Sequence, residues 1–74
     1  MAKEKLSPIA KNIRYYRKKL GISQDRLSKL ADVSHNTIVK IESGENPNPT
    51  IETLSKIAEA LSVSIDDLIR TKNK

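Results

Sequence analysis

Apolar residues recur along this chain at three- and four-residue spacing, in segments separated by short polar breaks. Such spacing places side chains on one face of a helix. The stripe of the first segment consists of Ile9, Ile13, Tyr16 and Leu20. Ser7 and Pro8 precede it as a typical helix start, because Ser caps and Pro suits the first helical position. We therefore predict a helix to about Leu20, with Gly21 as its left-handed end.

Two shorter helices, residues 24–31 and 35–43, are predicted next, joined by a tight turn. Ser23 and Ser34 stand where N-caps belong, and Gly44 is a typical left-handed stop. The residues expected to face inward are Leu27, Leu30 and Ala31 in the first helix and Ile38 and Ile41 in the second. The outward side chains of the second helix are mostly short and polar.

A loop and two further helices complete the pattern. Residues 45–49 contain two prolines and two asparagines, which favour an ordered loop. Thr50 caps a fourth helix, and a capping box at Ser64–Asp67 opens a fifth that runs to about Arg70. The apolar face of the fourth helix consists of Ile51, Leu54, Ile57, Ala58 and Leu61. With no strand signal, the predicted fold is all-α, a compact domain of five helices.

The length and composition limit the classes of protein to consider. We expect residues 1–74 to form one small domain, with an ordered core at about 7–70 and short flexible ends. The sequence contains no Cys, so disulfides, thiol catalysis and cysteine-bound zinc are excluded. It has neither a long apolar run nor an apolar segment near its N-terminus. We expect a cytoplasmic protein without a membrane span.

Positive charge is concentrated in the first part of the chain. Residues 1–43 hold ten Lys or Arg against four Asp or Glu, whereas residues 44–74 hold four against five. This asymmetry suits a surface that binds a polyanion, because cations beside phosphates release condensed counterions. A solvated lysine-rich surface is the alternative explanation of the same pattern.

The ordered set of these residues resembles the helix-turn-helix family of lambda-type repressors and Cro proteins, also called XRE-like. The matching residues are Gln24, Leu27, Ala31, Val33-Ser34, Thr37-Ile38, Ile41-Glu42-Ser43-Gly44, Pro49 to Leu54, Ile57-Ala58, Ala60-Leu61 and Val63 to Leu68. The resemblance covers roughly residues 9–69 and implies the lambda-repressor-like fold. Asp32 and Ser62 depart from it, since Gly is frequent at both positions.

The resemblance implies that residues 35–43 enter the major groove of double-stranded DNA. By position, His35, Asn36 and Lys40 are the principal base contacts, and Thr37 and Val39 are secondary ones. Asn can pair with adenine, Lys favours the guanine acceptors, and a neutral His can donate or accept. The alternative for His35 is an ordinary imidazole on a helix surface.

Contacts with the DNA backbone follow from the same resemblance. Gln24 and Ser34 lie at helix N-termini, where side chains and backbone amides bind phosphate. Ser43, Asn46 and Lys29 are weaker candidates for phosphate contact. Glu45 departs from the family pattern, and a carboxylate there argues against a phosphate contact by that side chain.

Arg17 and Glu42 resemble a pair that makes a partly buried salt bridge in many family members. Such a bridge ties the first helix to the helix that enters the groove. Arg suits this role because its planar fork can bind a carboxylate through two hydrogen bonds. Two unrelated surface charges are the alternative.

No catalytic or metal site is predicted. A single His, no Cys and scattered carboxylates form neither a nucleophile–base pair nor a metal cluster. We therefore expect no enzyme activity, no cofactor and no small-molecule ligand.

The function predicted is a sequence-specific transcriptional regulator that binds a palindromic DNA site as a homodimer. Ile65, Leu68 and Ile69 are the candidates for the dimer interface, because one small core does not easily bury all three. The alternative is an antitoxin-like module that neutralises a partner protein and binds DNA only for autoregulation. Such a module is expected to carry a long flexible extension that wraps its partner, whereas the segments outside the predicted helices here are residues 1–6 and 71–74.

Overall fold

The structure is a computed structural model that describes residues 8–70, and these residues contain helices and no strand. In chain order the helices are α1 (Pro8–Leu20), α2 (Gln24–Ala31), α3 (His35–Ser43), α4 (Ile51–Leu61) and α5 (Ile65–Ile69). The all-α prediction is confirmed, although α5 ends one residue before the predicted Arg70. The predicted Ser7 cap and the two predicted flexible ends lie outside the described residues.

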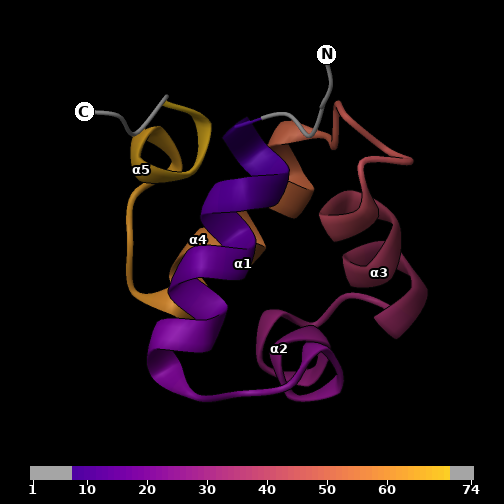
Figure 1. The fold of residues 1–74 in the computed structure, drawn as a ribbon, viewed down its shortest axis with the longest axis vertical. Coiled ribbons are helices and arrows are strands. Elements are labelled where there is room, and N and C mark those ends of the chain that lie inside the picture. Colours follow the sequence, from indigo (N-terminus) through magenta and orange to yellow (C-terminus); the bar gives the residue numbers. More distant parts are fainter. Residues whose placement is uncertain (1–7, 71–74) are drawn as a thin grey trace, which may run out of the picture.

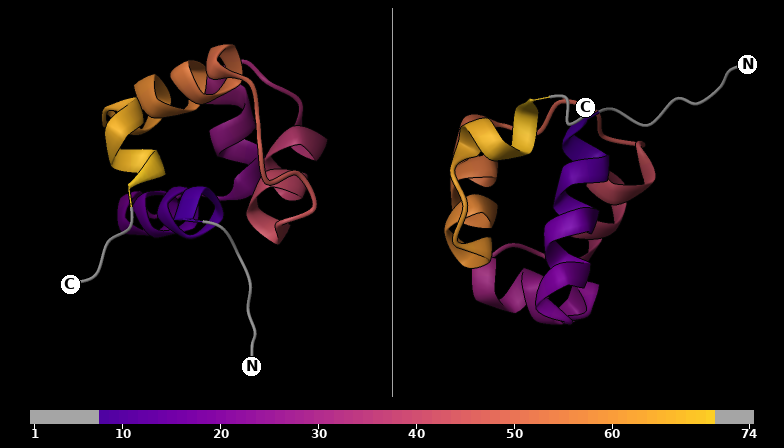
Figure 2. Two further views of the ribbon diagram at one scale, coloured as in Figure 1. Left: turned by 90° about the horizontal axis from the view of Figure 1, so that it is seen from above. Right: turned by 60° about the vertical axis from the view of Figure 1, so that its left-hand side comes forward.

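The helices surround one hydrophobic core. α1 lies between α5 on one side and α3 on the other (Figure 1), and α2 packs against both α3 and α4. Turned views show α4 and α5 together on one side of the molecule and α3 on the opposite side (Figure 2). The buried members of the core are Ile13, Leu27, Ala31, Ile38, Ile41, Leu54, Ile57, Ala58, Leu61 and Leu68.

Helices α2 to α5 begin at their predicted caps. The side-chain oxygens of Ser23, Ser34, Thr50 and Ser64 each accept a hydrogen bond from a backbone N–H three residues further on. The Asp67 carboxylate in turn accepts a hydrogen bond from the Ser64 backbone N–H, which completes the predicted capping box. Each such cap stabilises its helix by about 0.5 to 2 kcal/mol.

Two helices end at residues with left-handed backbone that are not glycine. Asp32 after α2 and Ser62 after α4 have φ values of 60° and 61°. In each case the backbone N–H bonds to carbonyls of the last helical turn, so the conformation satisfies groups that the helix leaves unpaired. A side chain in this region costs roughly 1 kcal/mol, which these hydrogen bonds offset.

Three residues predicted to face inward are exposed instead. Leu20, Leu30 and Ile51 are 53%, 50% and 69% exposed. Leu20 is the last residue of α1 and Ile51 the first of α4, so both lie on the correct face but beyond the end of the core. In α2 the buried face includes Ser28 rather than Leu30, and the Ser28 hydroxyl donates to the Asp25 carbonyl within the helix.

A buried asparagine that the apolar pattern did not indicate joins the first and last helices. Asn12 is 4% exposed, and its Nδ2 donates to the carbonyls of Leu68 and Arg70 at 2.8 and 2.7 Å. Carbonyls at a helix C-terminus have no partner within the helix. Asn12 therefore satisfies the end of α5 and fixes it beside α1.

Candidate nucleic-acid interface

Helices α2 and α3 form a helix–turn–helix unit with a buried inner side. Leu27 and Ala31 of α2 and Ile38 and Ile41 of α3 are at most 3% exposed. The Ser34 cap and the left-handed Asp32 define the turn between the two helices. The inner side of α3 is thus fixed against the domain, and its outer side faces solvent.

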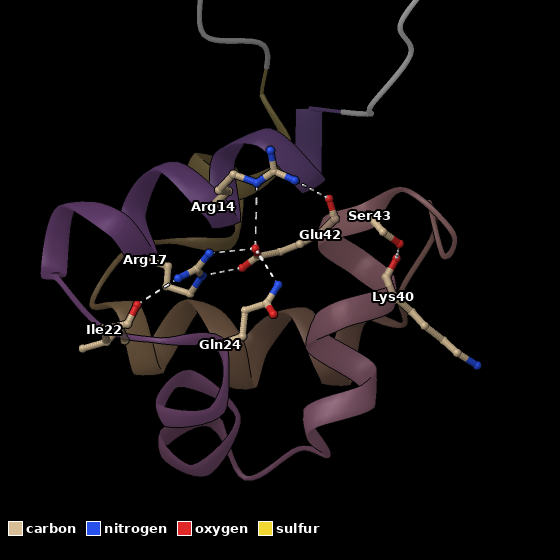
Figure 3. Close-up of polar contacts among 7 residues, drawn as sticks. All are labelled: Arg14, Arg17, Ile22, Gln24, Lys40, Glu42 and Ser43. Atoms are coloured by element: carbon tan, nitrogen blue, oxygen red, sulfur yellow. Dashed lines mark hydrogen bonds and ion pairs between the residues drawn. The ribbon is translucent and has the colours of Figure 1, made fainter.

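The outer side of α3 carries the residues predicted to contact bases. His35, Asn36 and Lys40 are exposed, and Val39 is 37% exposed. His35, Asn36 and Val39 line a shallow hollow of about 330 Å³. The Lys40 side chain extends away from the helix and from its neighbours (Figure 3). The structure therefore brings His35, Asn36 and Val39 together and leaves Lys40 exposed on the same helix.

Thr37 is placed differently from the other predicted base contacts. It is half-buried, and its hydroxyl lies 2.7 Å from the Ser34 hydroxyl. Ser34 Oγ also accepts the Thr37 backbone N–H at 3.0 Å. The two hydroxyls are therefore engaged with each other at the start of α3.

The opposite end of α3 is anchored by a buried ion pair between Glu42 and Arg17. Arg17 Nε lies 2.7 Å from one carboxylate oxygen of Glu42, and Nη2 lies 3.0 Å from the other (Figure 3). Arg17 Nη1 donates to the Ile22 carbonyl at 2.9 Å. The side chains of Arg17 and Glu42 are only 12% and 2% exposed, so solvent screens the pair little. The predicted salt bridge is present and is bidentate.

A second arginine of α1, Arg14, contacts Glu42, and the sequence did not predict this contact. Arg14 Nη2 donates to the Glu42 backbone carbonyl at 3.0 Å, and its Nε lies 3.9 Å from the carboxylate. Its side chain is 42% exposed, and such a pair contributes about 0 to 1 kcal/mol. Arg17 therefore carries most of the charge compensation. The three-residue spacing of the two arginines on one helix was the available signal.

Gln24, which was predicted to contact a DNA phosphate, also hydrogen-bonds to the Glu42 carboxylate. Its Nε2 donates to Glu42 Oε1 at 3.1 Å. An amide nitrogen carries two hydrogens, so one remains for another acceptor. Since Gln24 is the first residue of α2, this contact joins α2 to the α1–α3 ion pair. A phosphate contact by Gln24 stays a prediction.

Ser43 and Asn46, two predicted phosphate contacts at and just after the end of α3, hydrogen-bond to nearby backbone groups. Ser43 Oγ donates to the Lys40 carbonyl at 3.1 Å and accepts the Glu45 N–H at 3.2 Å. Asn46 Oδ1 accepts the Asn48 N–H at 3.2 Å, which leaves the Asn46 amide hydrogens available. Both side chains therefore shape the loop after α3, and of the two Asn46 has free donors for a phosphate.

Lys29 and His35 share one carboxylate that sequence reasoning did not single out. Asp25 Oδ2 lies 3.3 Å from Lys29 Nζ, and Oδ1 lies 3.6 Å from His35 Nδ1. The i,i+4 spacing from Asp25 to Lys29 was visible in the sequence. The approach of His35 was not, because it depends on how α2 and α3 cross.

The residues predicted for a dimer interface differ in exposure. Ile69 is 46% exposed and Ile65 is half-buried. Leu68 is 0% exposed and belongs to the core of the protomer. The prediction for Leu68 is therefore wrong, because the five-helix core accommodates this side chain and leaves no Leu68 surface for a second copy.

Two further features are absent from residues 8–70. No group of three or more His, Asp or Glu side chains that could hold a metal ion occurs there. No helix in this part of the chain is long and apolar enough to cross a membrane.

Comparisons with known proteins agree with this geometry. Residues 13–68 match the protein family described as Helix-turn-helix. The HTH-type transcriptional regulator SlrR of Bacillus subtilis is 37% identical over 60 residues, which are 81% of this chain and 40% of SlrR. The regulator SinR of Bacillus subtilis is 33% identical over 66 residues, which are 89% of this chain and 60% of SinR. The chain thus spans about half the length of these curated relatives.

Solved structures show the same fold. The N-terminal DNA-binding domain of SinR from Bacillus subtilis matches with a TM-score of 0.84 and 33% identity, covering 89% of this chain and 96% of that domain. The P22 c2 repressor, solved with a synthetic operator, matches with a TM-score of 0.78 and 36% identity, covering 86% of this chain and 96% of the repressor chain. The architecture is therefore that of a lambda-repressor-like domain. The chain belongs to the Helix-turn-helix family, as its resemblance implied.

The buried ion pair predicts a large effect of a nearly isosteric substitution. Glu42→Gln should lower the free energy of unfolding by about 3 to 5 kcal/mol, because it leaves the Arg17 charge buried without a carboxylate. Urea denaturation followed by circular dichroism measures this loss. The matched control is Glu59→Gln, because Glu59 is an exposed glutamate on α4. This substitution should change the free energy of unfolding by less than about 0.5 kcal/mol.

Non-additivity separates a true pair from two independent residues. Arg17→Met combined with Glu42→Gln should cost clearly less than the sum of the two single substitutions, because neither charge is then left alone. Additive losses, or a Glu42→Gln loss no larger than that of Glu59→Gln, would show that the pair does not carry the stability assigned to it.

Proposed function

We propose that this chain is a sequence-specific double-stranded DNA-binding transcriptional regulator that inserts α3 into the major groove. The observation that carries the proposal is the two-sided character of α3. Its inner side is anchored through Ile38, Ile41 and Glu42, whereas His35 and Asn36 at its N-terminal end are exposed. A helix held in this way presents side chains of fixed direction to base edges.

The charge distribution and the comparisons support the same proposal. The excess of Lys and Arg lies in residues 1–43, which include α2 and α3. The matching domain of SinR is described as DNA-binding, and the P22 c2 repressor was solved in complex with a synthetic operator. Both proteins match this chain over most of its length. Phosphate neutralisation then supplies affinity, and α3 supplies specificity.

The base contacts proposed differ in chemistry. Asn36 pairs with adenine through its amide, and Lys40 donates to the acceptors of guanine. His35 contributes one ring nitrogen, and Val39 suits a thymine methyl group. Thr37 is a weaker candidate because its hydroxyl is already engaged with Ser34.

The phosphate contacts proposed surround this helix. Gln24 and Ser34 stand at the N-termini of α2 and α3, where free backbone amides also face an anion. Asn46 follows α3 with free amide hydrogens, while Ser43 and Lys29 contribute less because each has a local partner. These contacts fix the register of the domain on DNA without reading its sequence.

A homodimer on a palindromic site completes the proposal. One such domain reads only a few base pairs, and two-fold pairing places two α3 helices about one helical turn, roughly 34 Å, apart. The surface proposed for pairing is α5, where Ile69 is 46% exposed beside the half-buried Ile65.

Binding to two duplexes tests whether α3 reads the sequence. Asn36→Ala should weaken binding to a duplex selected from random sequences by about 1 to 3 kcal/mol, and binding to a scrambled duplex much less. Gln24→Ala is the matched control for a backbone contact and should weaken both duplexes by similar factors. Fluorescence anisotropy at one salt concentration measures all four affinities.

The outcome is read as ratios between the duplexes. Circular dichroism first verifies that both variants keep the helical fold, since Gln24→Ala also removes a hydrogen bond to Glu42. If Asn36→Ala weakens both duplexes equally, or if the wild-type chain does not discriminate between them, α3 is not a sequence-reading helix and the proposal fails.

The dimer is tested with a pair of exposed isoleucines. Ile69→Glu should weaken self-association at least roughly tenfold, because it replaces apolar area that the interface would bury. Ile51→Glu alters an even more exposed isoleucine on α4 and should leave association unchanged. Sedimentation equilibrium gives both constants. Equal association of the two variants, or a loss confined to Ile51→Glu, would exclude α5 as the interface.

A further inference from the structure

The first turn of α2 places a carboxylate against the first residue of α3. Asp25 Oδ1 lies 3.6 Å from Nδ1 of His35, and the other carboxylate oxygen lies 3.3 Å from Lys29 Nζ. The side chains of Asp25 and His35 are 53% and 52% exposed. Ion pairs between side chains as exposed as these add little to stability. The contact between Asp25 and His35 is therefore not explained by a contribution to the stability of the fold.

The geometry has a direct consequence for the histidine ring. A neutral imidazole carries one hydrogen, and the group that faces one nitrogen determines which nitrogen holds it. The 3.6 Å separation exceeds hydrogen-bond length, so the carboxylate acts here through its charge. A negative charge on that side favours the tautomer with hydrogen on Nδ1. Nε2 is then left as a hydrogen-bond acceptor.

No described residue hydrogen-bonds to Nε2, so this nitrogen is available to a ligand of α3. In the major groove, adenine and cytosine present an exocyclic amino group that donates, whereas guanine and thymine present acceptors at the corresponding edge. An acceptor at Nε2 therefore complements adenine N6 or cytosine N4. A hydrogen on Nε2 would instead complement an acceptor, namely guanine O6 or N7, thymine O4 or adenine N7, so cytosine is the base that only the acceptor form can pair with.

We propose that Asp25 is a positioning residue that sets the base preference of His35, making it a reader of exocyclic amino groups. This inference rests on the proposed function, because it requires α3 to lie in the major groove. Asp25 does not touch DNA in this arrangement and acts only through the imidazole. Lys29 balances the second carboxylate oxygen, which limits repulsion between Asp25 and the phosphates.

The experiment measures base preference at a single position of the site. His35→Ala first identifies that position as the one where discrimination is lost among duplexes that carry each of the four base pairs. Binding is measured near pH 8, where most histidine side chains are neutral. The wild-type chain should favour adenine or cytosine there by roughly threefold to tenfold, the size of one net hydrogen bond.

Four variants then separate positioning from stability and from overall charge. Asp25→Ala should reduce this preference to less than about twofold, and Asp25→Glu should retain most of it because the carboxylate remains. Glu52→Ala is the matched control, since Glu52 is an exposed acid at the same position in the first turn of α4. It should keep the wild-type preference. In the His35→Ala background, Asp25→Ala should change nothing at this position.

The results that would contradict the role of Asp25 differ from those that would contradict DNA reading by α3. The inference is overturned if Asp25→Ala keeps the wild-type preference, or if the wild-type chain favours guanine or thymine. It is also overturned if His35→Ala changes no position while Asn36→Ala still relaxes specificity, and the proposed function then stands. If the wild-type chain distinguishes no duplex from any other, the inference and the proposed function fail together.

Discussion

The burial of one carboxylate, that of Glu42, sets the arrangement of the first three helices. Removing such a group from water costs several kcal/mol unless a partner of good geometry replaces the lost hydration. Arg17 supplies two hydrogen bonds from α1, Gln24 supplies one from α2, and Arg14 binds the backbone of the same residue. Because all three groups must be in place together, the position of α3 depends on the completed fold.

This dependence matters for the surface that α3 presents. The helix has nine residues, and isolated helices shorter than about 12 residues are marginal in water. Its direction therefore comes from Ile38, Ile41 and Glu42 on the inner side rather than from its own helical propensity. A rigidly held helix can place short polar side chains within hydrogen-bond reach of base edges, where small displacements cost affinity. The buried anchor of α3 and the proposed DNA-reading residues therefore lie on opposite sides of one helix.

The sequence predicted most of what is local. Caps such as Ser34 and Thr50 act over three residues, so helix starts followed from neighbouring positions. Periodicity identified the buried face but not where the core ends, which is why Ile51 was placed inward. The pairing of Arg17 with Glu42 came from the family resemblance. The contacts of Asn12 with α5 and of Asp25 with His35 were not predicted, because the packing of the helices determines which residues on other helices lie beside them.

The most direct test of this account is to map which residues respond when duplex DNA is added. In a nuclear magnetic resonance titration with a duplex selected from random sequences, the backbone amides of Gln24 and of residues 34–40 should show the largest shift changes. The exposed side of α4, around Glu52 and Glu59, should change little. Large changes on α4 with α3 unaffected would contradict the central claim that α3, anchored through Glu42, is the DNA-reading element.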